Sequence, residues 1–301
     1  MRLQKTIVKL VGTPEKGAVS MGLLKDRAIR IKTTDNAVIE CLHIEGKGTP
    51  IILIPGSGDG INTVGGFPNS YMLARMYKKY SRTHDIFVIS RREPIPEGFT
   101  PRDFAMDYVM VMDKLEIDKA HIETNSAGGP IGQWIAIDFP DRVISLVLGS
   151  TMVYIDNRLN EILIQWLDWI EVDQWFKLYI DSVIKSYTPR YCRKYRWVFP
   201  ILRLLKKPKN PDRIKRLFKG LLEFNNMDLI NKISCPALVI GGDMDEITNL
   251  GMQTDMANAI SGAKQIVLQG VGHGAYQEAK KEYESNILSF YDDVNGGNYE
   301  D

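Results

Sequence analysis

Residues 124–129 read Thr-Asn-Ser-Ala-Gly-Gly, and they carry the strongest chemical signal in the sequence. Residues 120–123 before them are β-prone, and residues 131–139 after them favour a helix. The sequence therefore predicts a tight strand-to-helix turn that presents Ser126 and needs small neighbours such as Gly128. The turn also aims the first free N–H groups of the helix at the hydroxyl, where the helix dipole favours negative charge. A serine-glycine turn that merely caps a helix has a similar sequence, so the surroundings must decide between the two interpretations.

The alternation of strand and helix continues on both sides of this turn. Helical patterns separate the strands, and the helix that starts at Pro101 has Thr100 as its N-cap and Asp103 in its first turn. The sequence thus predicts an α/β fold, with a mostly parallel central sheet flanked by helices. Short apolar runs typical of strands buried on both faces of a parallel sheet lie at residues 51–54, 86–89, 143–148, 236–240 and 265–268.

The alternation is interrupted between residues 152 and 231. This stretch is helix-prone and contains four of the five tryptophans. We therefore expect residues 1–151 and 232–301 to form the two parts of one α/β core, with residues 152–231 inserted between them as a helical cap. Trp166 and its apolar neighbours fall near a helical repeat, which is more typical of packing than of ligand contact.

The composition excludes several classes of protein. The 301 residues are 44% hydrophobic and 25% charged with a net charge of +1, which is typical of a globular protein and gives no general reason to expect a nucleic-acid partner. The three cysteines are widely spaced, as expected for reduced thiols. The N-terminal residues lack the apolar core of a signal peptide, and no apolar run approaches the length of a membrane span. We therefore expect a cytoplasmic protein without stable membrane insertion.

A nucleophilic serine needs a base and a group that orients the base. Among the four histidines, only His273 follows a predicted strand on a permissive backbone, because residues 270–274 read Gly-Val-Gly-His-Gly. Residues 241–245 read Gly-Gly-Asp-Met-Asp after the preceding strand, so Asp243 and Asp245 are both candidates for the orienting acid. Spacing alone does not choose between these two aspartates.

A third loop, residues 55–58 with the sequence Pro-Gly-Ser-Gly, follows the strand at 51–54. Its small residues allow backbone N–H groups to approach a ligand closely. A phosphate-binding Walker loop requires a lysine that is absent here, and a dinucleotide fingerprint requires glycine at Ile61. The glycine loop, Ser126, an aspartate and His273 each follow a predicted strand, and ligands bind at the carboxyl ends of strands in such sheets.

With these features, residues 28–150 and 233–293 resemble the α/β-hydrolase superfamily, in its cap-bearing serine esterase-like branch. The most specific stretch is 99–151, and the chain order Ser…Asp…His is also the family's order. The resemblance implies that Ser126 is the nucleophile, His273 the base and Asp245, rather than Asp243, the acid. It also implies that the backbone N–H groups of Ser57 and Ala127 form the oxyanion hole, and that residues 152–231 form the cap.

The sequence departs from the family pattern at three places. Thr124 stands where the turn usually begins with glycine, and Pro55 stands where relatives often have histidine. Residues 90–94 read Ser-Arg-Arg-Glu-Pro where relatives often carry an aspartate and a glycine-rich turn. These departures leave the triad intact, but they prevent the resemblance from implying a substrate.

We therefore expect a serine hydrolase of small carboxylic esters or related acyl compounds that uses no metal or organic cofactor and acts as a monomer or homodimer. C–C bond hydrolysis, a lyase or perhydrolase reaction on the same triad, and a slow-turnover receptor for a small ligand are the alternatives. Activity should fall at acidic pH as His273 protonates.

Residues 185–219 contain thirteen basic residues and one acid, which is typical of a solvated surface over an apolar underside. A membrane-surface or anionic-substrate role for this stretch is the alternative.

Overall fold

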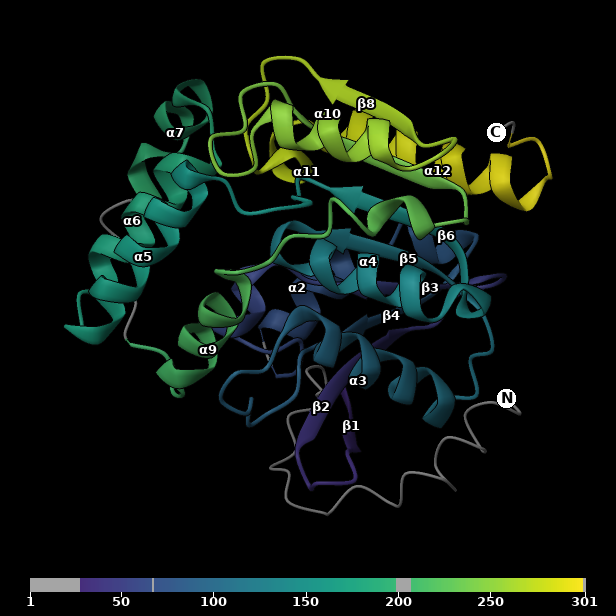
Figure 1. Ribbon diagram of the computed structural model, residues 1–301, viewed down its shortest axis with the longest axis horizontal. Coiled ribbons are helices and arrows are strands. Elements are labelled where there is room, and N and C mark those ends of the chain that lie inside the picture. The colour runs from purple at the N-terminus through teal and green to yellow at the C-terminus, as the bar shows by residue number, and fades with distance from the viewer. Residues whose placement is uncertain (1–27, 67, 199–206, 300–301) are drawn as a thin grey trace.

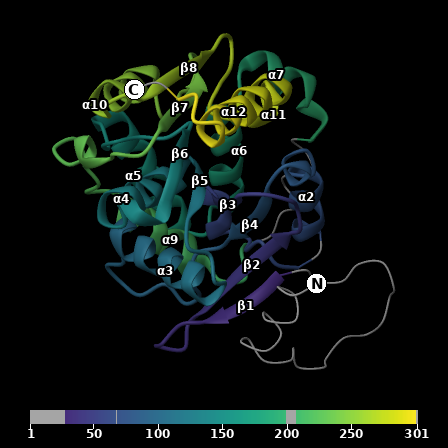
Figure 2. The same ribbon diagram turned by 90° about the vertical axis from the view of Figure 1, so that its right-hand side faces the viewer.

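The central sheet confirms the predicted architecture. The computed structural model describes residues 28–66, 68–198 and 207–299, which form an eight-stranded sheet of order β1-β2-β4-β3-β5-β6-β7-β8 (Figure 1). Neighbouring strands pair in parallel along β4, β3, β5, β6, β7 and β8. At one edge β2 pairs antiparallel with β4, and β1 pairs antiparallel with β2 (Figure 2). The strands span Ala28–Lys32 (β1), Val38–Ile44 (β2), Pro50–Ile54 (β3), Asp85–Ile89 (β4), Ala120–Asn125 (β5), Val143–Gly149 (β6), Ala237–Gly242 (β7) and Lys264–Leu268 (β8).

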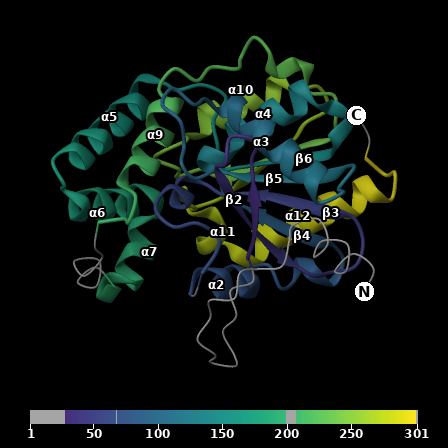
Figure 3. The same ribbon diagram turned by 90° about the horizontal axis from the view of Figure 1, so that it is seen from below.

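Helices cover both faces of the sheet, which explains why its central strands are apolar on both sides. Figure 3 shows α3, α4 and α10 on one face and α2, α11 and α12 on the other. Two clusters of buried apolar side chains correspond to these two faces. The helices span Asn69–Met76 (α2), Pro101–Lys114 (α3), Gly129–Asp138 (α4), Leu250–Ala259 (α10), Ala275–Glu278 (α11) and Lys280–Asn295 (α12).

The ends of two helices test the expectations from the sequence. Thr100 caps α3 as predicted, because its hydroxyl accepts from the Asp103 N–H while the Asp103 carboxylate accepts from the Thr100 N–H. The sequence pattern of residues 275–291 also predicts a single last helix, and this prediction is wrong, since the backbone leaves the helical region at Ala279 and divides it into α11 and α12. The Glu278 carboxylate, at the end of α11, instead accepts hydrogen bonds from Thr188.

The segment between β6 and β7 is helical where the structure describes it. Its helices gather at one side of the molecule in Figure 1, and α5 buries an apolar face that continues into the cluster on the α3 and α4 side of the sheet. Residues 199–206 lie outside the described residues. The division of residues 152–231 from the core as a separate cap stays a prediction. The helices span Asn157–Glu171 (α5), Trp175–Ser186 (α6), Pro189–Lys194 (α7) and Pro211–Leu221 (α9).

Two further observations concern the setting of the protein. Cys41, Cys192 and Cys235 are free thiols, and all three lie within the described residues. Across residues 28–66, 68–198 and 207–299, every helix is too short or too polar to cross a bilayer.

Candidate active site

Ser126 lies at the corner where β5 ends and α4 approaches. Its φ of +49° is in the left-handed region, which costs a non-glycine residue backbone strain. The turn also packs tightly against β3, because a Cβ atom at Gly128 would lie 2.5 Å from the carbonyl oxygen of Ile54. The predicted strand-to-helix turn is therefore present, with Ser126 9% exposed at the wall of a cavity.

Thr124, the departure at the start of the turn, is accommodated by the helix that follows. Its hydroxyl donates a 2.8 Å hydrogen bond to the Val147 carbonyl on the neighbouring strand. Its methyl group occupies the space beside Gly132, where a Cβ atom would lie only 2.4 Å from it. A bulky residue at position 124 is thus possible because position 132 in α4 has no side chain.

The structure brings Ser126, His273 and Asp245 together. The Nε2 atom of His273 lies 2.8 Å from the Ser126 Oγ, and its Nδ1 lies 2.8 Å from an Asp245 carboxylate oxygen. The His273 side chain is 10% exposed and that of Asp245 is fully buried. The three groups come from loops after β5, β7 and β8, so parallel strands deliver them to the same edge of the sheet.

Asp245 is held as a carboxylate acceptor by its own loop. One oxygen accepts from the backbone N–H groups of Ile247 and Thr248, both at 2.8 Å. The other accepts from the Thr248 hydroxyl at 2.8 Å as well as facing His273, and that hydroxyl lies 3.3 Å from the His273 Nδ1. Thr248 therefore contacts both the Asp245 carboxylate and the His273 imidazole.

Asp243, the alternative acid, has a different position. Its carboxylate accepts from the backbone N–H groups of Gly270, at 2.7 Å, and Val271, at 3.2 Å. It thus supports the loop that carries His273, whereas Asp245 contacts the imidazole itself.

Arg91 holds the glycine loop after β3 by hydrogen bonds to its carbonyl groups. The Arg91 guanidinium donates to the carbonyls of Pro55 at 3.0 Å and Gly56 at 3.1 Å, and also to the Ala127 carbonyl at 2.9 Å. Arg91 therefore joins the glycine loop to the turn that carries Ser126. The guanidinium is completely buried, and its charge is paired with Asp59 at 3.4 Å.

The two peptide units expected to stabilise an oxyanion are each fixed by a side chain. The carbonyl bound by Arg91 at Gly56 belongs to the same peptide unit as the Ser57 N–H. The Ser126 carbonyl, which shares a peptide unit with the Ala127 N–H, accepts a 2.6 Å hydrogen bond from the Thr151 hydroxyl. Because C=O and N–H point in opposite directions across a trans peptide, both N–H groups are directed away from the side chains that hold them.

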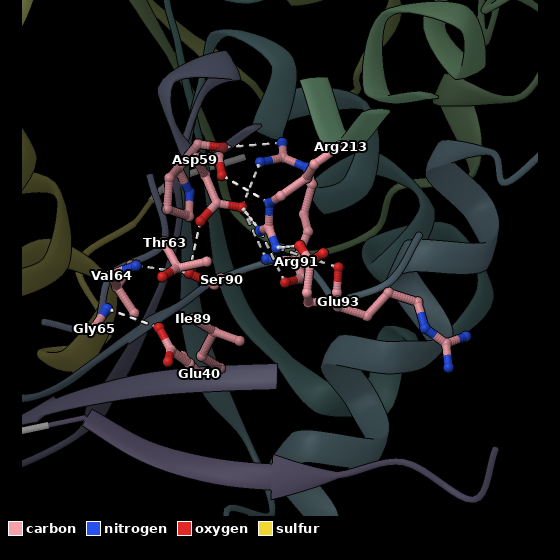
Figure 4. A network of polar contacts seen from close by, with 12 residues as sticks. Glu40, Asp59, Thr63, Val64, Gly65, Ile89, Ser90, Arg91, Glu93 and Arg213 are labelled. Carbon is pink, nitrogen blue, oxygen red and sulfur yellow. Dashed lines mark hydrogen bonds and ion pairs between the residues drawn. The ribbon is translucent and has the colours of Figure 1, made fainter. Parts of the chain in front are cut away.

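A buried ion-pair network connects the glycine loop to helix α9 (Figure 4). Arg213 of α9 donates to the Asp59 carboxylate at 2.7 Å and to the carbonyls of Arg91 and Asp59, both at 2.9 Å. Its side chain is 4% exposed. The expectation of a solvated surface for residues 185–219 is therefore wrong at Arg213, because a charge on this helix has its partner inside the protein.

A cavity of about 530 Å³ lies over the Ser126 hydroxyl. Ser57, Ser126 and His273 line it on the core side, and Trp166 is among the residues that line it from the inserted helices. Trp166, for which packing was the more typical role, is buried in the apolar core and also lines the cavity, and its indole N–H donates to Asp181 at 2.7 Å. Tyr187 lies so close to the His273 loop that a Cβ atom at Gly274 would come within 2.2 Å of its ring.

His43 and His121, which lie in strands, have structural contacts. His43 stacks on Phe87 and binds Asp85 at 2.8 Å, and His121 is buried against the Ser145 hydroxyl at 2.7 Å. Among the described residues no group of histidine, cysteine and acidic side chains is arranged to hold a metal ion.

Sequence reasoning missed three residues that organise this site. Arg91 lies in the stretch that departs from the family pattern, and Thr151 ends the stretch that resembles the family most, so both positions carried a signal. Thr248 carried none, because a threonine three residues after an aspartate is common in loops. Its role depends on the fold of residues 245–248 around the carboxylate.

Residues 49–280 match the model of the alpha/beta hydrolase fold, which is more than half of the chain. The chain therefore belongs to the alpha/beta hydrolase family, and it is a hydrolase.

Individual relatives are more distant. A putative carbamate hydrolase, RutD, from a Caulobacter species is 24% identical over 61% of this chain and 69% of its own length. The 2-hydroxy-6-oxo-2,4-heptadienoate hydrolase of Pseudomonas putida is 29% identical, over 36% of this chain and 39% of its own. The crystal structure of the enol-lactonase from Burkholderia xenovorans has a TM-score of 0.76 at 18% identity, covering 87% of this chain and 99% of that one. These matches support a shared fold and leave the substrate open.

Proposed function

We propose that this protein is a serine hydrolase of small carboxylic esters or related acyl compounds, and that Ser126, His273 and Asp245 are its catalytic triad. The observation that carries the proposal is the unbroken chain of contacts from the Ser126 hydroxyl through the His273 ring to the buried Asp245 carboxylate, with 2.8 Å at each step. A hydroxyl becomes a nucleophile when a base so placed can take its proton.

In the proposed reaction the Ser126 Oγ attacks the acyl carbonyl while His273 Nε2 accepts its proton. Asp245 orients the imidazole and stabilises the imidazolium that forms. The imidazolium then protonates the leaving alcohol, which departs and leaves an acyl-enzyme. Water, deprotonated by the same imidazole, attacks the acyl-enzyme and releases the acid and Ser126.

The oxyanion of each tetrahedral intermediate would be bound by the N–H groups of Ser57 and Ala127. Two contacts support this assignment: Arg91 holds the carbonyl of one peptide unit and Thr151 that of the other. Donors fixed before the reaction need no reorganisation during it, and the loss of one donor typically costs ~3–4 kcal/mol of transition-state stabilisation. The cationic Arg91 also polarises the Gly56–Ser57 peptide in the favourable direction.

The names of relatives favour one second candidate. The Pseudomonas putida relative is a hydrolase of a dienoate, so cleavage of a C–C bond by the same triad is the alternative to ester hydrolysis.

We also propose that residues 152–231 act as a cap over the cavity, supported by the contribution of Trp166 and Tyr187 to its lining. The three free thiols support the proposed cytoplasmic location.

The test compares the wild type with Ser126→Ala on short-chain 4-nitrophenyl esters, with labelling by a fluorophosphonate in parallel. Multiple turnover and labelling that both disappear in Ser126→Ala support the proposal. Labelling without ester turnover would favour the C–C bond alternative, which a vinylogous diketone substrate then tests. One-shot labelling by the ester itself would favour a receptor, and turnover that survives in Ser126→Ala would refute the triad.

A further inference from the structure

The cavity extends beyond Ser126 to the α2 and α12 face of the sheet. Leu53, Val88 and Glu123 are direct partners across β3, β4 and β5, so their side chains share this face, and all three line the cavity. Tyr77, which directly follows α2, and aromatic residues of α11 and α12 line the same region. We call it the tyrosine lobe, defined by Leu53, Val88, Glu123, Tyr77, Tyr276 and Tyr283.

Glu123 is the unusual member of the tyrosine lobe. The residue is only 5% exposed, and one of its carboxyl oxygens accepts a 2.8 Å hydrogen bond from the Tyr291 hydroxyl. The other oxygen receives no hydrogen bond from any residue that the structure describes. It is also not one of the fully buried polar atoms that lack a partner. Because Glu123 lines the cavity, this oxygen is open to a hydrogen bond from a molecule bound there.

The surroundings of Glu123 are aromatic and acidic. The Glu123 charge contributes to raising the pKa values of Tyr77, Tyr80, Tyr276, Tyr283 and Tyr291, which places all five rings near its carboxyl. A second carboxylate, Glu284, lies behind Tyr276, whose hydroxyl donates to it at 3.1 Å. Burial, with a further contribution from Glu284, raises the pKa of Glu123 to about 8 despite the hydrogen bond from Tyr291.

No cationic side chain among the described residues compensates Glu123. Lys280 lies 3.5 Å from Glu284 and thus serves the other carboxylate. His121, two residues earlier on β5, is kept neutral because burial lowers its pKa to about 4. His84, which packs against Tyr291, also has its pKa lowered by burial.

A carboxyl group ringed by tyrosines matches one ligand chemistry. Aromatic faces attract cations, and a carboxylate that lacks a counter-charge gains most from an ammonium group. We propose that the tyrosine lobe binds an alkylammonium group of the substrate, so that the enzyme acts on acyl compounds with a cationic end. This inference rests on the proposed function for its catalytic meaning. Glu123 lies three residues before Ser126 on an extended strand, which separates the cation from the reacting carbonyl by roughly 10 Å.

Binding to the full-length Ser126→Ala protein tests the lobe without catalysis. Titration calorimetry at pH 7 compares n-hexylammonium with 1-hexanol, which has the same chain and a neutral end. We expect the cation to bind at least about tenfold more tightly, and Glu123→Gln in the same background to abolish this preference. Hexanoate, as an anionic control, should bind most weakly. Equal affinities for hexylammonium and hexanol would overturn the inference.

A second measurement needs no substitution at Glu123. Because the carboxyl is mostly protonated at pH 7 with a pKa of about 8, an ammonium ion that makes it ionise should release up to about 0.9 proton. Titrations in two buffers of different ionisation enthalpy report that release, and 1-hexanol should give none. Hexylammonium binding without proton release, with a preference for the cation that survives in Glu123→Gln, would place the cation elsewhere and would also overturn the inference.

The two proposals fail separately. In the wild type, hexylammonium should inhibit 4-nitrophenyl hexanoate hydrolysis competitively. Ester turnover that depends on Ser126 but is indifferent to hexylammonium would leave the hydrolase proposal standing and remove the ammonium lobe. Hexylammonium binding with proton release, in a protein that hydrolyses no ester, would confirm the lobe as a binding site and remove its proposed catalytic meaning.

Discussion

The hydroxyl of Thr151 donates a 2.6 Å hydrogen bond to the carbonyl oxygen of Ser126. This contact fixes the peptide unit that carries the Ala127 N–H, from the side opposite to the cavity. Arg91 does the same for the peptide unit of the Ser57 N–H. The proposed oxyanion hole is therefore built from two backbone groups whose directions are set by side chains outside the cavity lining.

Substitution of Thr151 tests this arrangement. Thr151→Val preserves the shape of the buried side chain but removes one hydrogen bond worth ~1–1.5 kcal/mol, so we expect kcat on an ester to fall about tenfold. KM should stay unchanged because the lost bond acts on the transition state. Thr151→Ser keeps the hydroxyl and should stay close to the wild type. Equal kcat for the valine and serine variants would show that the hydroxyl does not position the peptide.

The two aspartates near His273 offer a matched pair. Asp245→Asn replaces the carboxylate that contacts the imidazole, and we expect kcat to fall by ~10³–10⁴, as is typical when the orienting acid is neutralised. Asp243→Asn should lose less than about tenfold, because an amide oxygen can still accept from the Gly270 and Val271 N–H groups. Steady-state kinetics on one ester settles the assignment. A larger loss for the substitution at 243 would reverse it.

The contact between Thr124 and Gly132 predicts a rescue. Gly132→Ala places a methyl group 2.4 Å from the Thr124 methyl, so we expect unfolding free energy to fall by about 1–3 kcal/mol in urea titrations. Thr124→Ser removes the obstructing methyl and keeps the hydroxyl that binds the Val147 carbonyl. In that background only the Leu146 side chain, 3.2 Å from the new Cβ atom, remains close, and alanine favours the helix, so Gly132→Ala should cost clearly less than in the wild type. Additive losses in the double variant would contradict this account.

The alternation of apolar runs and helical patterns was enough to predict the sheet, because burial on both faces leaves a local signature in each strand. Thr100, Ser126 and His273 were likewise visible, since each stands in a short motif whose neighbours define its geometry. Arg213 was not: its partner Asp59 is 154 residues away, and nothing near it distinguishes a buried arginine from an exposed one. The break at Ala279 accompanies contacts of Glu278 with Thr188, which is 90 residues away in the chain.

Glu123 illustrates the same limit within a correctly predicted strand. The β-prone run at 120–123 predicted its backbone, but a glutamate there reads as an ordinary strand position. Its surroundings depend on Tyr77 at the end of α2 and on tyrosines of η2 (Tyr80–Arg82), α11 and α12, which only the packing of these elements against the sheet brings together.

Arg213 should matter far more to stability than its helical neighbour Lys215. Arg213→Met leaves the buried Asp59 with one cationic partner fewer, and we expect a loss of about 3–5 kcal/mol in unfolding free energy. Lys215→Met breaks only a partly exposed ion pair with Glu171 of the neighbouring helix α5 and should cost less than about 1 kcal/mol. Urea titrations of the two variants provide the measurement, and similar losses would mean that the Asp59 network contributes little beyond packing.

The raised pKa of Glu123 predicts the direction in which the unfolding free energy changes with pH. Below the ordinary glutamate pKa of 4.5 the carboxyl is protonated in both states, and above its folded pKa of about 8 it is ionised in both. Between these values the folded protein retains a proton that the unfolded chain has lost. Its contribution to unfolding free energy therefore falls by up to about 1.4 kcal/mol for each unit of rising pH.

Urea titrations from pH 5.5 to 7.5 should show the wild type losing stability relative to Glu123→Gln, which cannot ionise. Saturating hexylammonium should reduce this slope, because a cation beside the carboxyl lowers its folded pKa. Parallel curves for the two proteins would mean that Glu123 titrates normally in the folded state.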